Sequence, residues 1–160
     1  MATREARAMK LLLIHASKFW WHIRGVARGL KIRDEPEPGE ADFEDVIVVF
    51  TAVERGDTEA RAHALHKAVD AILEFSKRVK CSSIVLYPYA HLTTELAGPG
   101  EALELLRELE DALRGCGLNV TRAPFGYYKE FLLHCKGHPL SEAFRDIRTN
   151  TNARCDPQGG

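Results

Sequence analysis

The chain has 160 residues, of which 45% are hydrophobic, and its formal net charge is −1 at pH 7. This length supports one compact core and is short for two ordinary domains. No apolar run approaches the roughly 20 residues that a membrane-spanning helix requires, so a cytoplasmic protein without a membrane partner is expected. A near-zero charge gives no global attraction to nucleic acid, so any binding of RNA must be local.

Four cysteines, at positions 81, 116, 135 and 155, lie far apart and form no CxxC pair. Their spacing predicts neither a zinc ribbon nor a dithiol redox site, and reduced, mostly buried thiols are expected. Cys135 and His138 are close in sequence, but two ligands without a second pair are weak support for a metal site.

The first half of the chain predicts strands that enclose a loop and are followed by a helix. Apolar runs over 10–15 and 45–53 are typical of strands buried on both faces, and 19–23 can form another strand. Two prolines in 35–39 exclude regular structure there, because proline has no N–H to donate. Gly56-Asp57 offers a helix start, and apolar residues at helical spacing predict an amphipathic helix over 57–80.

The second half of the chain predicts three strands and two helices. The strands are expected over 83–87, 118–123 and 127–134. A helix begins at Pro99 and is ended by Gly115 and Gly117, and a last short helix is expected over 139–147. One domain thus covers 1–147, and the polar residues 148–160 are expected to form a frayed tail or the start of a linker.

The order of strand 46–53, helix 57–80 and strand 83–87 predicts a crossover between parallel strands, whose carboxyl ends share one edge of the sheet. Ligands bind at that edge in sheets of this kind. It would carry Thr51–Val53 and Tyr87–His91, so the sequence predicts a site there.

Several residues near this edge can do chemistry, and each also has a structural interpretation. His91 follows the strand that ends at Pro88 and suits proton chemistry, although it can equally cap a turn. Tyr128 and Lys129 begin a strand, where alternation sends their side chains to opposite faces, as in a core residue beside a solvated one. Glu142 is expected one turn into the last helix, where a carboxylate also favours the positive helix end.

Four long sequence words carry a resemblance to a known family. They are Leu12-Leu-Ile-His15, Tyr87-Pro-Tyr-Ala-His-Leu-Thr-Thr-Glu-Leu-Ala97, Ala123-Pro-Phe-Gly-Tyr-Tyr-Lys129 and Cys135-Lys-Gly-His-Pro-Leu140. In this order they resemble the N-terminal editing domain of archaeal threonyl-tRNA synthetases. The resemblance runs from about Met9 to Ile147 and is far more specific than a short glycine motif.

The resemblance implies an α/β fold like that of D-aminoacyl-tRNA deacylases, with a mixed β-sheet curled against two main helices, here with the short C-terminal helix added. It implies a homodimer that hydrolyses the ester of L-serine wrongly attached to the 3′ adenosine of threonine tRNA and leaves threonyl-tRNA intact. No metal or organic cofactor is expected. The synthetase's catalytic domains are expected either fused to this domain or on a separate chain.

The resemblance also implies the site residues. The side chains expected in catalysis are those of Lys129, His91, Tyr128 and Glu142. The backbone atoms expected to hold the aminoacyl group and the adenosine are those of Val53, Tyr89, Ala90 and Phe125. Lys129 would act either as an electrostatic stabiliser or as a base with a strongly lowered pKa, and the sequence leaves this open. Two other functions also stay open: a D-aminoacyl-tRNA deacylase and a non-catalytic RNA-binding appendage.

Overall fold

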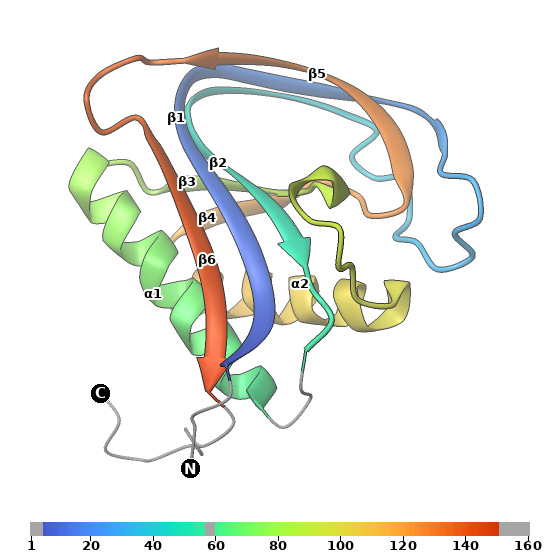
Figure 1. Ribbon diagram of the computed structural model, residues 1–160. Coiled ribbons are helices and arrows are strands. Elements are labelled where there is room, and N and C mark those ends of the chain that lie inside the picture. The colour runs from blue at the N-terminus through green and yellow to red at the C-terminus, as the bar shows by residue number, and fades with distance from the viewer. Residues whose placement is uncertain (1–4, 57–59, 151–160) are drawn as a thin grey trace.

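The computed structural model describes residues 5–56 and 60–150 (Figure 1). Its elements in chain order are β1 (Glu5–Val26), β2 (Glu40–Val53), α1 (Arg61–Val79), β3 (Ser83–Pro88), η2 (Ala90–Leu92), α2 (Pro99–Gly115), β4 (Asn119–Arg122), β5 (Tyr127–Cys135) and β6 (Glu142–Asn150).

The strands form one mixed sheet in the order β4-β3-β2-β1-β5, and β6 also pairs with β1. The pairs β2–β3 and β3–β4 are parallel, while β1 pairs antiparallel with β2, β5 and β6. The long strand β1 shares one edge between two partners, with β6 along its first half and β5 along its second half. The parallel pairing of β2 and β3 confirms the predicted crossover geometry.

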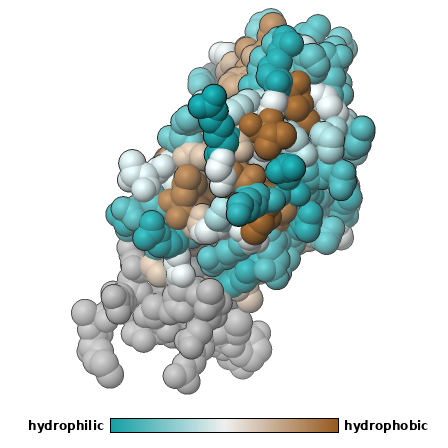
Figure 2. Space-filling view, turned by 90° about the vertical axis from the view of Figure 1, so that its right-hand side faces the viewer, coloured by the Kyte–Doolittle hydropathy of each residue, from teal (hydrophilic) through white to brown (hydrophobic). Residues whose placement is uncertain are grey.

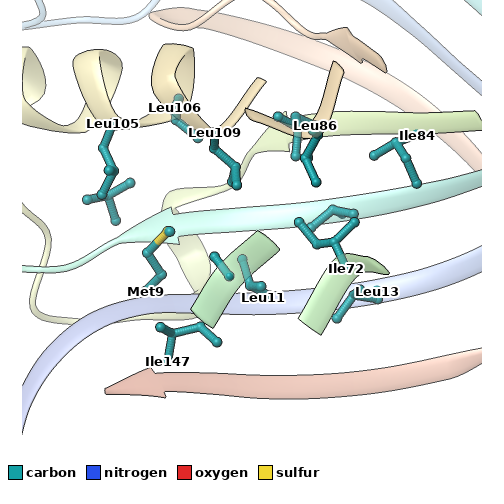
Figure 3. Close-up of a cluster of buried hydrophobic side chains, with 14 of the residues drawn as sticks. Met9, Leu11, Leu13, Ile72, Ile84, Leu86, Leu105, Leu106, Leu109 and Ile147 are labelled. Atoms are coloured by element: carbon teal, nitrogen blue, oxygen red, sulfur yellow. The ribbon is translucent and has the colours of Figure 1, made fainter. Parts of the chain in front are cut away.

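Both helices pack on one face of the sheet and form the first hydrophobic core (Figure 3). Leu11 and Leu13 of β1 point to this face because side chains alternate along a strand. Ile72 of α1 and Leu109 of α2 meet them there, and all four side chains are fully buried. The helical spacing of the apolar residues in α1 and α2 thus serves to cover the sheet.

The opposite face carries a second, aromatic core, because the sheet curls over itself. A register shift between Ala16 and Lys18 keeps Phe19 and Trp21 on the same inner face as Ile14. Phe131 of β5 lies 5.4 Å, centroid to centroid, from Tyr87 of β3, although these strands are not neighbours in the sheet. This contact across the sheet is what curling achieves, and Figure 1 shows β5 bending over the sheet.

Most predicted elements are confirmed. The strands expected over 10–15 and 19–23 belong to the single strand β1. The predicted helix over 57–80 is observed as α1 over Arg61–Val79, and its expected start at 57–59 lies outside the described residues. Of the two tryptophans, Trp21 is fully buried and Trp20 only partly, as opposite-facing positions require. Of the cysteines in the described ranges, only Cys81 is buried, so the expectation of mostly buried thiols is wrong for Cys116, which is exposed.

The predicted helix over 139–147 is wrong, because residues 139–141 form a turn and the rest of the segment belongs to strand β6. Its residues alternate in burial, with Ile147 and Thr149 buried and Phe144 exposed, which is the period of a strand. Nine residues of β1 pair with it, and this ladder outweighs the helix-start signal of Pro139. Arg148 to Asn150, which were assigned to the tail, end this strand, and the remainder of the predicted tail lies outside the described residues. No helix among the described residues is long and apolar enough to cross a membrane.

Candidate active site

A cavity of about 520 Å³ opens where the carboxyl ends of β2 and β3 meet, as the crossover predicted. Its walls come from the ends of these two strands, the segment through η2, the first turns of α2 and the beginning of β5. Hydrophobic and aromatic residues dominate the lining, as is usual for small-molecule sites. Figure 2 views the molecule from the side that carries these segments, and hydrophobic patches gather in the middle of that face among hydrophilic ones.

Lys129 supplies the ammonium group of the cavity. Its Nζ donates to the carbonyl of Tyr127 at 3.2 Å and lies 5.1 Å from the centroid of the Tyr87 ring. Burial lowers the pKa of Lys129 from its ordinary value of 10.5 to about 8, and the charge of Asp34 opposes that effect. A lysine whose pKa lies this near neutrality, within a cleft, is a candidate functional group.

The floor of the cavity is aromatic. Tyr87 is 3% exposed, and burial raises the pKa of its hydroxyl, so the ring contacts Lys129 as a neutral phenol. Phe131, two residues after Lys129 on β5, shares its face and packs against Tyr87. This apolar surround accounts for the partial desolvation of the ammonium.

His91 and Tyr128 lie at the rim. His91 is exposed on the short helix η2, with its ring 5.2 Å from that of Tyr89. Tyr128 alternates with Lys129 along β5, is 55% exposed, and its hydroxyl accepts the N–H of Arg28. The structure therefore brings the predicted residues Lys129, His91 and Tyr128 around one cavity.

The four residues expected to act through their backbone also line the cavity, namely Val53, Tyr89, Ala90 and Phe125. Several of their groups are already engaged. The Val53 carbonyl accepts the N–H of Ala97, and the Tyr89 N–H donates to Thr51. The Phe125 N–H donates to the carboxylate of Asp34, so Phe125 offers a ligand its ring but no free backbone donor.

Glu142 stands apart from this group. It is exposed at the start of β6, where it pairs with Ile14, and it is not among the residues that line the cavity. The expected helix over 139–147 would have placed Glu142 one turn after a helix start. Because β6 is a strand, Glu142 lies beside the first half of β1, whereas the cavity borders the second half through β5.

Sequence reasoning missed some residues of the site. Phe131 could have been found from strand alternation with Lys129, since both occupy odd positions of β5. The α2 residues Ala102 and Leu106 line the cavity but read as ordinary core positions. Asp34, which acts on Lys129 from a loop, had no local signal at all.

A second polar cluster joins the turn between β5 and β6 to the first strands. The Leu140 N–H donates to Nδ1 of His138, so a neutral His138 carries its proton on Nε2 and donates it to Nδ1 of His15. His15 then carries its own proton on Nε2 and donates it to Asp45 at 2.8 Å. This series of hydrogen bonds satisfies both imidazoles and fastens the turn to the sheet.

The same cluster contains metal-ligand types. One ligand atom each of His15, Asp45 and Cys81 lie within 4.8 Å of one another. The nitrogen of His15 that faces Asp45 carries a proton in the hydrogen-bond series, so these residues fit the series better than a cation. The Cys135 and His138 pair considered from sequence is also engaged, with Cys135 donating to Ser141 and His138 donating to His15.

Solved structures share this architecture. A probable eukaryotic D-amino acid tRNA deacylase covers 88% of this chain with a TM-score of 0.58 at 14% identity. A c-Myc DNA unwinding element binding protein covers 86% of this chain with a TM-score of 0.60 at 13% identity. The chain therefore has the α/β fold of D-aminoacyl-tRNA deacylase-like structures.

The family follows from the sequence match. Residues 9–147 match the Archaea-specific editing domain of threonyl-tRNA synthetase, and the chain belongs to this family. It is thus a proofreading domain with a deacylase activity.

Two relatives illustrate the family. A threonine–tRNA ligase of Staphylothermus marinus is 50% identical over 88% of this chain, which spans 22% of that protein. A threonine–tRNA ligase editing subunit of Saccharolobus solfataricus is 44% identical over 88% of this chain, which spans 35% of that protein. The chain is therefore similar to only one part of each relative.

Proposed function

We propose that the cavity hydrolyses the ester between L-serine and the 3′-terminal adenosine of threonine tRNA and spares threonyl-tRNA. The observation that supports this most directly is the position of Lys129, an ammonium of lowered pKa in an aromatic cavity. His91 and Tyr128 flank it at the rim, and all three stand in the sequence words that carry the family resemblance.

Hydrolysis of such an ester passes through a tetrahedral oxyanion. Water adds to the carbonyl carbon, the bond from that carbon to the ribose oxygen breaks, and serine and the free tRNA end are released. The Lys129 ammonium stabilises the negative charge that develops on the carbonyl oxygen, and a low-polarity cavity strengthens this interaction. His91 and Tyr128 orient the ribose and the aminoacyl group, and the ribose hydroxyl next to the ester positions the water, as the family resemblance implies.

Discrimination rests on the size of the cavity near the ester. Serine and threonine differ by one methyl group, and binding alone separates such a pair by only about 1–3 kcal/mol. A second site that accepts serine and loses its water when threonine enters multiplies the selectivity of the synthetic site.

The test compares three substrates on the purified chain: seryl-tRNA, threonyl-tRNA and a D-aminoacyl-tRNA. Rapid deacylation of seryl-tRNA with little effect on threonyl-tRNA is the expected result. Preference for the D-aminoacyl substrate would replace the proposal with chirality proofreading. Binding of tRNA without release of any amino acid would leave a non-catalytic appendage.

The partner of this domain is a threonyl-tRNA synthetase catalytic unit, fused or separate, acting in the cytoplasm. The names of the relatives support both arrangements, since one is a whole ligase and the other an editing subunit. Adding a separately purified catalytic unit that mischarges threonine tRNA with serine tests this directly. The chain is expected to lower the yield of seryl-tRNA and not that of threonyl-tRNA.

A homodimer completes the proposal and gives Glu142 a role. Within one chain Glu142 lies away from the cavity, so it contributes to a site only if a second copy brings it there. Exposed apolar side chains on β5 and β6, Leu132 and Phe144, offer a surface for such a copy.

Mixing two inactive variants tests this arrangement. Lys129→Met and Glu142→Ala are each expected to be inactive alone. In a dimer that shares its sites, the mixture recovers about a quarter of the wild-type activity, because half of the dimers are mixed and each mixed dimer has one intact site. No recovery, or a fully active Glu142→Ala variant, would remove Glu142 from the site.

A further inference from the structure

Asp34 is an unusually well-bound carboxylate in the loop between β1 and β2. Its side chain is 10% exposed and contacts the guanidinium groups of Arg122 and Arg107. Burial alone would raise the pKa of Asp34, but the Arg122 guanidinium, the Phe125 N–H and Arg107 together hold that pKa below its ordinary value. The loop therefore carries a fixed negative charge beside the cavity.

The main chain of Asp34 binds the same wall of the cavity that its carboxylate binds. Its N–H donates to the Phe125 carbonyl at 3.0 Å, while the Phe125 N–H donates to its carboxylate at 2.9 Å. The Tyr127 hydroxyl donates to the Asp34 carbonyl at 2.6 Å. Asp34 thus takes part in three hydrogen bonds that fix the turn from which β5 begins.

This turn carries Lys129. The Tyr127 carbonyl accepts the Lys129 ammonium, so Tyr127 is bonded to Asp34 through its hydroxyl and to Lys129 through its backbone. The Tyr87 ring of β3 lies beneath the ammonium. His91 and Tyr89 line the cavity on the side of η2. The charge of Asp34 acts on Lys129, and the guanidinium groups of Arg122 and Arg107 partly neutralise that charge.

We propose that Asp34 is a positioning residue of the deacylation site, which fixes the Phe125–Lys129 wall through its hydrogen bonds to Phe125 and Tyr127. The negative charge of the same carboxylate also acts on Lys129. Asp34 does not line the cavity and touches no substrate, so it acts through Phe125, Tyr127 and Lys129. This inference rests on the proposed function for its catalytic meaning, whereas its electrostatic part concerns the protein alone.

The test variant is Asp34→Asn, which keeps an acceptor oxygen for the Phe125 N–H and removes the charge. Arg122 retains its ion pair with Glu110 in this variant. Lysine-selective NMR of the carbon next to Nζ follows the ionisation of Lys129, and the rate of seryl-tRNA deacylation is measured over the same pH range. The midpoint near pH 8 is expected to fall by about 0.5–1 pH unit in both measurements.

The direction of this shift does not depend on how Lys129 acts. A stabilising ammonium loses activity as pH rises through the ionisation, and a general base gains activity there. In both cases the midpoint of the pH profile is that of the Lys129 ionisation. A residue with a purely structural role would change the rate without moving this midpoint.

Arg107→Gln is the matched variant, because it removes a cation from the same carboxylate at a side chain that is 56% exposed. It leaves the negative charge of Asp34 less neutralised, so the Lys129 midpoint is expected to rise. If Asp34→Asn does not fold, this upward shift still decides the electrostatic part. A Lys129 midpoint that stays in place in both variants, or that rises in Asp34→Asn, would overturn the inference. Absence of any deacylation by the wild-type chain would instead overturn the proposed function, and the NMR titration would still stand.

Discussion

The Lys129 ammonium lies 5.1 Å from the centroid of the Tyr87 ring, which reaches it from a different strand. Tyr87 is fixed within the aromatic core of the curled sheet, and Lys129 is held by the Tyr127 carbonyl. This arrangement places a cation on a low-polarity surface at the carboxyl ends of the parallel strands β2 and β3.

Lys129→Met is expected to reduce deacylation of seryl-tRNA by at least about 100-fold, since the loss of one oxyanion donor has an effect of this size. Single-turnover rates with preformed seryl-tRNA measure it. Lys18→Met is the matched control, because Lys18 is half exposed, lies outside the cavity and has its ammonium 4.0 Å from the exposed carboxylate of Asp42. Equal rates for Lys129→Met and the wild type would remove Lys129 from the reaction.

The same substitution is expected to stabilise the fold. The pKa of Lys129 is about 8 in the folded protein and 10.5 in its ordinary state, so the unfolded chain binds more protons between these values. The wild-type free energy of unfolding therefore rises as the pH increases from 8 to 10.5. Below pH 8 Lys129 is protonated, and its buried charge destabilises the fold by the full amount. Lys129→Met is expected to be more stable by about 1–2 kcal/mol at pH 7, and the difference should shrink toward pH 10.5. Denaturant unfolding at both pH values checks this, and a difference that grows with pH would contradict it.

Gly126→Ala is expected to destabilise the protein and to distort the cavity wall. Gly126 has φ 96°, and a Cβ there would lie 2.4 Å from Cβ of Arg33 in the loop that carries Asp34. A loss of about 1–3 kcal/mol in the free energy of unfolding is expected. Gly25→Ala in β1 is the control, since a Cβ there meets nothing within 4 Å. Similar unfolding curves for the two variants would argue against a close approach at Gly126.

His15→Ala is expected to destabilise the protein by about 1–3 kcal/mol, because it removes a buried ring and its hydrogen bonds to His138 and Asp45. Asp45 keeps its ion pair with Lys136 in this variant. Unfolding in urea at pH 7 measures the loss. His66→Ala is the comparison, as His66 is exposed and pairs with Asp70 on its own helix. An effect no larger than that of His66→Ala would show that the hydrogen-bond series adds little stability.

Chelation is expected to leave the deacylation rate unchanged. Ligand atoms of the described residues His15, Asp45 and Cys81 lie within 4.8 Å of one another, yet Nε2 of His15 donates its proton to Asp45 in the hydrogen-bond series. The rate after extensive dialysis against EDTA is the measurement. Loss of activity that zinc restores would assign the cluster a metal and require a different mechanism.

The sequence determined the elements whose signals are local. Repeated apolar spacing specified α1 and α2, and β-branched runs specified the central strands, because a helix or a buried strand must present one pattern along its whole length. The order of those elements also predicted the sheet edge at which the cavity lies. The prediction failed at β6, where a proline and a glycine turn suggested a helix that only pairing with β1 could exclude.

The tertiary structure decided how the site residues meet. The sequence words placed Lys129, His91 and Tyr128 at the site but not their environment, since the floor under Lys129 is a tyrosine more than 40 positions earlier and its nearby charge lies in a loop. Curling brings those segments together, and the burial that follows sets the pKa of the lysine. The sequence gives the identity of each side chain, whereas its exposure to solvent depends on every segment that packs around it.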